Sequence, residues 1–206
     1  MTTTAQDAVA KTPIDIAVRH MGFSFPDDLP RYWVSNDPFE THLFNGLSLT
    51  FPLGEKQFVD SVRAYASQIT DPALADDVRA FIGQEMQHSR EHETFNAWIE
   101  KQGLPADYIY AYIRERIEKS KVELPQKTQL AITCALEHFT AIMASVILED
   151  PDFFASVDER VRMLWLWHAI EETEHKAVAF DVFQHVGGSY RTRALTMVFV
   201  TTQFIW

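Results

Sequence analysis

Residues 164–175 read LWLWHAIEETEH, and this stretch decides the fold because it places histidine and glutamate on an apolar helix. A helix turns about 100° per residue, so His168, Glu172 and His175 lie within roughly 60° of arc and share one face. The neighbouring side chains are mostly tryptophan, leucine, alanine and isoleucine, which is unlike a solvated helix. Imidazoles and carboxylates that converge from an apolar helix are typical ligands of a transition metal.

The composition is that of a globular protein with an acidic surface. The chain has 206 residues, 47% of them apolar, and a formal net charge of −11. We expect one domain over 1–206 with a sizeable core, and the negative charge argues against nucleic acid as a partner. The single cysteine, Cys134, excludes an internal disulfide and a thiolate zinc site. The first twenty residues lack a continuous apolar stretch, so we expect no signal peptide and a cytoplasmic protein.

The pattern of apolar residues predicts an all-α fold, with no alternation long enough for a sheet. Residues 1–45, rich in proline and aromatics after residue 22, are expected to form an arm on the body. Long helices are predicted from about 52 to 69, 71 to 103, 125 to 148 and 156 to 186, with a shorter helix over 105–121. Four long helices with accessory helices indicate a four-helix bundle.

The apolar segment 190–206 ends without a polar tail and is too short to span a bilayer. We interpret it as a core or interface helix, or as a longer apolar segment that is truncated here. We expect such a segment to associate with a membrane or to form a homodimer interface.

Bundles that hold two metal ions use one glutamate from each of two helices and Glu-x-x-His from each of the other two. Glu85 and His88 form one such motif, and Glu172 and His175 form the second. The spacing places the carboxylate one turn from the imidazole. This pattern therefore predicts a ferritin-like bundle with a dinuclear metal site.

The pattern also requires single glutamates on the first and third long helices. Glu137 is the one carboxylate between residues 124 and 148, where a buried charge needs a partner; the alternative is a solvated helix face. Glu55 is the candidate on the first helix, although a carboxylate near a helix start is also favoured by the dipole. Glu40 competes with Glu55 but lies in the arm.

Further polar residues accompany these motifs. His168 precedes Glu172 by one turn and is expected to be a ligand. His92, one turn after His88, could serve as a ligand, as a hydrogen-bonding partner of a ligand, or as a packed core residue. Asp181 is a candidate acceptor that orients a ligand imidazole. Three other residues are expected to face elsewhere: His138, Glu171 and His185.

Four segments, LSLTFPLGEKQF, FIGQEMQHSREH, ALEHFT and WHAIEETEHKAVAFDV, resemble a bacterial family catalogued as predicted metal-dependent hydrolases within the ferritin-like superfamily. The resemblance covers roughly residue 14 to the C-terminus. Members of that family continue into a longer apolar segment, which implies that this chain is truncated. The spacing His168-x3-Glu172-x2-His175 is also similar to the last ligand helix of the di-iron arylamine N-oxygenases, but only in ligand spacing. Carried over, that similarity implies these metal ligands: Glu55, Glu85, His88, Glu137, His168, Glu172 and His175.

Such a nitrogen- and oxygen-rich set suits two metal ions, iron above all, with manganese and zinc also compatible. The first hypothesis is a di-iron oxidase or oxygenase with O2 as co-substrate and a small organic, apolar substrate. The second is a two-metal hydrolase, which needs cationic or N–H donors near the site. The third is a metal-storage or interaction module.

Overall fold

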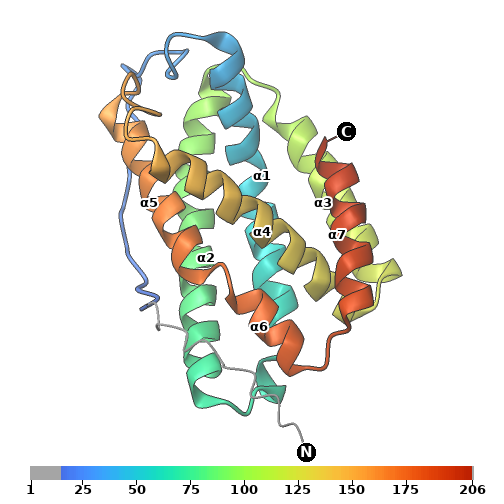
Figure 1. The fold of residues 1–206 in the computed structure, drawn as a ribbon. Helices are drawn as coiled ribbons and strands as arrows, with labels where there is room; N and C mark the ends of the chain where they lie inside the picture. Colours follow the sequence, from blue (N-terminus) through green and yellow to red (C-terminus); the bar gives the residue numbers. More distant parts are fainter. Residues whose placement is uncertain (1–14, 206) are drawn as a thin grey trace, which may run out of the picture.

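The structure is a computed structural model that describes residues 15–205, with side chains placed through residue 203. Its described part is entirely helical, as predicted (Figure 1). The helices are α1 (Pro38–Arg63), a short 3-10 turn η1 (Ala66–Gln68), α2 (Pro72–Lys101), α3 (Ala106–Glu123), α4 (Gln126–Glu149), α5 (Glu159–His175), α6 (Val178–His185) and α7 (Tyr190–Ile205). The chain folds as an all-α bundle in which α1 and α2 run antiparallel, α4 crosses them, and α3 and α7 lie along one side.

Helix α1 begins at Pro38, so the predicted start near Pro52 is wrong, and residues 38–45 belong to the helix rather than to the arm. The Asp37 side chain accepts a hydrogen bond from the Glu40 backbone N–H at 2.9 Å and caps the helix. Pro38 occupies the first turn, where its missing N–H costs nothing. The sequence therefore contained a helix start, but at an earlier proline than the one chosen.

Pro52 lies inside α1, and a side chain of α2 replaces the hydrogen bond that the proline removes. Proline lacks an N–H, so the carbonyl of Ser48, four residues earlier, has no intrahelical donor. The Asn96 side chain on α2 donates to this carbonyl at 3.0 Å. The proline thus creates a free acceptor that ties α1 to α2.

Helix α1 ends at Arg63, so the predicted end near residue 69 is also wrong, whereas the bounds of α2, α3 and α4 agree with the predicted ones within two residues. Asp71 caps α2 by accepting from the Ala73 N–H at 2.9 Å, as its position before a proline indicated. The predicted helix over 156–186 is interrupted directly after His175, at residues 176–177. Neither residue is proline or glycine, so neither marks a helix break in the sequence. The bend allows α6 to pack its apolar face, including Phe183, into the core.

Two apolar clusters fill the bundle. One contains Trp33, Phe95 and Trp165, and the other contains Phe81 and Phe183. Each such buried side chain contributes about 1.5–3 kcal/mol by leaving water. On α1, α2 and α4, the glutamates and histidines of the predicted site fall in sequence between residues of one cluster and residues of the other. The predicted ligands therefore form a polar layer between two apolar regions.

The described part of the arm, residues 15–37, runs along the bundle without forming a helix. The buried carboxylate of Glu91 on α2 holds it, accepting from the backbone N–H groups of Gly22 at 2.9 Å and Phe23 at 2.8 Å. Gly22 has φ +67°, a conformation that favours glycine. Phe23 then packs edge-on against Trp167 at 5.7 Å between ring centroids.

One described helix, α4, is long and apolar enough to cross a membrane by length and composition alone. It packs inside the bundle against α5 and α7 and carries the buried Glu137. Only 44% of its most apolar stretch is buried, and Ile142 and Val146 are exposed, so core packing accounts for part of its apolar character.

Candidate metal centre

Four helices bring seven potential metal ligands together. No side chain among them is more than 5% exposed. Their donor atoms form three groups in which every atom lies within 4.8 Å of the others. The groups are Glu55, His88 and His168; Glu85, Glu137 and His175; and Glu85, His88 and Glu172. All seven residues that the sequence singled out thus converge in the fold.

Glu172 lies at the middle of the cluster. Its Oε1 atom is 3.0 Å from His168 Nε2, 3.6 Å from His88 Nδ1 and 3.6 Å from His175 Nε2. His175 Nε2 is also 3.1 Å from Glu85 Oε1. One carboxylate therefore faces an imidazole nitrogen from each of the three histidines, as a ligand shared between two ions would.

Most of the inward-facing atoms have no hydrogen-bond partner. These buried atoms are Glu55 Oε1, both carboxylate oxygens of Glu85 and of Glu137, Glu172 Oε2, His88 Nδ1 and His175 Nε2. Leaving so many buried polar groups unpaired is costly unless a cation binds among them. The donor set fits divalent metal ions: four carboxylates would balance the charge of two such ions.

Hydrogen bonds outside the cluster fix the His168 ring so that Nε2 points into the cluster, where it lies within hydrogen-bond distance of Glu172 Oε1 at 3.0 Å. Asn96 donates its N–H to the Ser48 carbonyl, so its oxygen accepts the Ser48 hydroxyl proton at 2.6 Å. The Ser48 oxygen must then accept from His92 Nδ1 at 2.8 Å. His92 Nε2 is consequently an acceptor for His168 Nδ1 at 2.7 Å. The series of hydrogen bonds that begins at the carbonyl freed by Pro52 therefore ends by directing His168 Nε2 toward the carboxylates.

His175 is oriented in the same way from a different helix. Gln84 donates its two amide protons to the Ala17 carbonyl at 3.0 Å and the Glu174 carboxylate at 2.8 Å. Its oxygen therefore accepts from His175 Nδ1 at 2.8 Å, which directs Nε2 toward the cluster.

His88 is oriented by Glu171. The Glu171 carboxylate accepts from Trp167 Nε1 at 2.9 Å, from Arg19 at 3.0 Å and from His88 Nε2 at 3.0 Å. The lone pair of His88 is consequently on Nδ1, which faces Glu172. The expectation that Glu171 faces elsewhere is therefore wrong: its carboxylate is buried against a candidate ligand, although it belongs to none of the three donor groups. Its orienting role was missed in the sequence.

Arg19 links two of these orienting networks. Besides Glu171, its guanidinium contacts both carboxylate oxygens of Glu174, at 2.8 and 2.7 Å. Glu174 holds Gln84, which in turn orients His175. An arginine of the arm therefore supports two ligand histidines, and no spacing rule could have identified it.

The pKa shifts describe a cluster that attracts positive charge. Burial and repulsion from other carboxylates raise the pKa of Glu55 and Glu137 well above their usual range. Burial lowers the pKa of His88 well below its usual range, so this imidazole is neutral. Burial alone would lower the pKa of His175, but Glu172 and other carboxylates outweigh burial and raise it. The charge of a metal ion would relieve the same repulsion.

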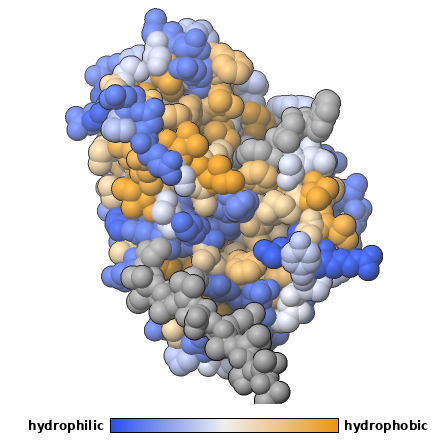
Figure 2. All heavy atoms as spheres, viewed as in Figure 1, coloured by the Kyte–Doolittle hydropathy of each residue, from blue (hydrophilic) through white to orange (hydrophobic). Residues whose placement is uncertain are grey.

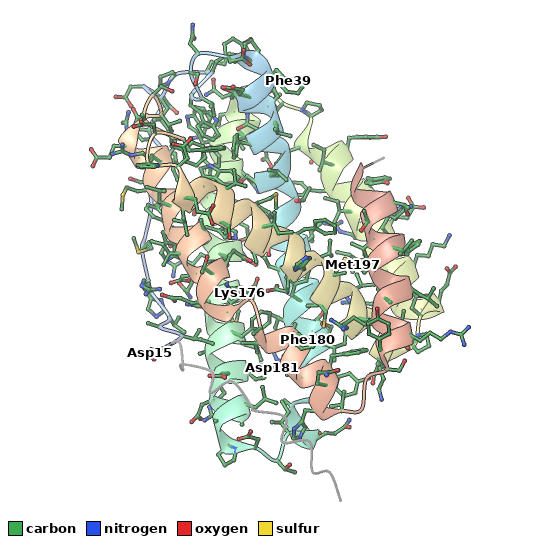
Figure 3. All side chains as sticks on the ribbon, in the orientation of Figure 1. Asp15, Phe39, Lys176, Phe180, Asp181 and Met197 are labelled. Carbon is green, nitrogen blue, oxygen red and sulfur yellow. The ribbon has the colours of Figure 1, made fainter. Side chains whose placement is uncertain are left out.

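The remaining candidates lie outside the cluster. His92 is buried and orients His168, which selects the second of its three predicted roles. Asp181 lies on α6, beyond the bend at Lys176, in none of the three groups (Figure 3). Glu40 is exposed at the start of α1, and His138 is exposed on α4.

An apolar pocket of about 240 Å³ reaches the cluster between α1, α4 and α5. His168 and Glu172 form its inner wall, and Trp165 contributes to its side. None of the described residues that line it is arginine or lysine. The pocket therefore offers a route from the surface to the candidate ligands through an almost wholly apolar lining.

Comparisons with known proteins agree with a metal-dependent function. The model of a family described as predicted metal-dependent hydrolase matches residues 17–206. No curated protein and no solved structure gave a match. Because the match covers nearly all of the chain, this protein belongs to the predicted metal-dependent hydrolase family.

Proposed function

We propose that this protein is an enzyme with a dinuclear metal centre of the ferritin-like type. The ligands would be Glu55, His88 and His168 at one ion and Glu85, Glu137 and His175 at the other, with Glu172 shared. The observation that supports this assignment is the set of buried, unpartnered donor atoms around Glu172. The three imidazoles are already held with one ring nitrogen directed inward, which reduces the cost of ordering them when metal binds.

We further propose that the ions are iron and that the reaction is an oxidation that uses O2. When bound, iron supplies the redox chemistry in an environment of carboxylates and imidazoles, and an external electron donor completes the electron balance. The apolar pocket beside His168 and Glu172 supports oxidation because its lining provides no cation or amide donor for the oxyanion of a hydrolytic reaction. The protein residues would bind the substrate and keep water out.

The second candidate is a two-metal hydrolase, which the description of the family favours. In a two-metal hydrolase the metal ions would polarise the scissile carbonyl or phosphoryl oxygen, and a cationic side chain would add to that stabilisation. Arg19 contacts the residues that orient the candidate ligands, but its guanidinium is engaged by Glu171 and Glu174. The pocket therefore offers no additional cation for a hydrolytic intermediate, and its apolar lining is what favours the oxidase.

The first experiment is elemental mass spectrometry on protein purified without added metal. We expect about two iron ions per chain. Glu137→Gln should lower this content, whereas Glu149→Gln, on the exposed end of the same helix, should leave it unchanged. Unchanged metal content in Glu137→Gln would refute the ligand assignment.

The reaction class is tested on the same sample by anaerobic reduction followed by exposure to O2. We expect an oxygen-dependent change in the absorbance spectrum. Bound zinc or manganese with no response to O2, together with ester or amide hydrolysis, would instead support the hydrolase.

A further inference from the structure

We propose that the apolar pocket binds an uncharged hydrocarbon chain, alkyl or alkyl-aromatic, with one end against Glu172 and His168. This inference names the substrate class and rests on the proposed function of the same site. It follows from three properties of the pocket: its lining, its mouth and its volume.

The lining offers a polar substrate group few partners. Apart from His168 and Glu172 at the inner end, two polar side chains line the pocket: Thr140 and Trp165. The Thr140 hydroxyl donates to the Glu137 carbonyl at 3.0 Å, and the indole Nε1 of Trp165 is buried without a hydrogen-bond partner. Away from these two side chains, a hydroxyl, ether or charge in a bound molecule would lose its water without forming a new hydrogen bond. The chain inside the pocket must therefore be hydrocarbon over most of its length.

The mouth of the pocket is also apolar. Leu43 on α1, Ile142 and Val146 on α4, and Phe153 after α4 line the pocket and are exposed to solvent. Figure 2 shows apolar residues gathered where α4 crosses the bundle in Figure 1. A chain longer than the pocket can therefore continue over an apolar rim, and a polar head group can remain in water.

The volume sets the length of the buried part. A cavity of about 150 Å³ lined by aliphatic and aromatic side chains holds benzene. By this scale, the volume of about 240 Å³ holds about ten carbon atoms. The pocket is thus larger than a one- or two-carbon substrate requires, and its apolar lining does not match the polar groups of a sugar or a nucleotide.

The inference is tested by equilibrium binding of straight-chain alcohols to the purified full chain under anaerobic conditions, where no turnover occurs. Trp165 lines the pocket, so its fluorescence should report occupancy. We expect affinity to rise about fourfold for each added methylene group, because each buries a constant apolar area. The rise should level off near about ten carbons, where the pocket ends.

A matched ligand and a matched pair of variants make the test specific. Triethylene glycol is about as long as nonanol but polar along its whole length, so it should bind at least about tenfold more weakly. Met143 lines the pocket, and Met163 is an exposed methionine outside it. Met143→Trp should weaken nonanol binding at least about tenfold by filling the space, whereas Met163→Trp should leave it unchanged.

Equal binding of nonanol and triethylene glycol, or affinity independent of chain length, would overturn the inference even if Met143→Trp failed to fold. Binding is measured without O2, so the two proposals fail separately. Chain binding without any oxygen reaction would refute the oxidase and keep the pocket assignment. An oxygen reaction without binding of the hydrocarbon chain would support the oxidase and refute the pocket assignment.

Discussion

Replacing Glu171 with glutamine tests whether a residue outside the ligand set controls the metal centre. Three donors converge on this carboxylate: Arg19 and Trp167 on Oε1, and His88 Nε2 on Oε2. Glutamine has one oxygen and one NH2 group, so it can accept on one side only. Placing the oxygen toward Arg19 and Trp167 satisfies two donors rather than one, and the NH2 group then faces His88.

His88 would have to accept a hydrogen bond at Nε2 and carry its proton on Nδ1, the atom that faces Glu172. The lone pair needed for metal binding would be lost from that position. Changes of this kind cost about ten- to hundredfold in metal affinity, or about 1.4–2.8 kcal/mol. We expect Glu171→Gln to weaken zinc binding by that factor in competition with a chelating dye, zinc serving as a redox-silent probe.

The matched control is Glu91→Gln. Glu91 is also a buried glutamate that accepts from two donors, but those are the Gly22 and Phe23 backbone N–H groups of the arm. Its replacement should lower stability and, because the arm that it holds also carries Arg19, should lower zinc affinity by clearly less than Glu171→Gln does. Wild-type zinc affinity in Glu171→Gln, with imidazole nitrogen shifts that still place the proton on Nε2 of His88, would refute the reasoning.

Three further outcomes are expected. Asn96→Leu should lower the free energy of unfolding in urea by about 1–3 kcal/mol, since the carbonyl that Pro52 leaves free loses its donor; adding Pro52→Ala should restore part of it, and strictly additive effects would contradict the link. Because folding raises the pKa of Glu55 and Glu137, their contribution to the stability of the metal-free protein should be greatest below the unfolded pKa of about 4.3 and should be lost as pH rises toward the folded pKa; urea titrations in which the double glutamine variant loses stability as steeply over this range would contradict this. Burial raises the pKa of the Cys134 thiol to about 12, so a thiol reagent at neutral pH should label it only when the protein unfolds, and rapid labelling of the folded protein would count against its burial.

The sequence predicted the helices and the ligand set from local spacing. Glu85 with His88, and Glu172 with His175, are one turn apart, and helical geometry alone places such pairs on one face. Glu137 stood out because it is a lone carboxylate in an apolar helix, where burial without a cation is unfavourable. These inferences needed no knowledge of which helices are neighbours.

The errors arose where the local pattern was ambiguous. Pro38 and Pro52 are both compatible with a helix start, and only the Asn96 contact from α2 shows how a proline is accommodated inside α1. The break after His175 has no proline or glycine to mark it, and it reflects the packing of α6 on the core.

The residues that orient the histidines depend on contacts between distant segments. Arg19 and Glu171 are 152 positions apart, and His92 meets His168 across 76. A helix fixes which side chains share its own face, because its repeat is set by the backbone. The partner that each face meets is set by packing and loop closure, which no spacing within one helix encodes. The sequence by itself thus determined the helical fold class and the candidate ligands. The tertiary structure decided which ring nitrogen each histidine directs into the cluster and which apolar pocket reaches it.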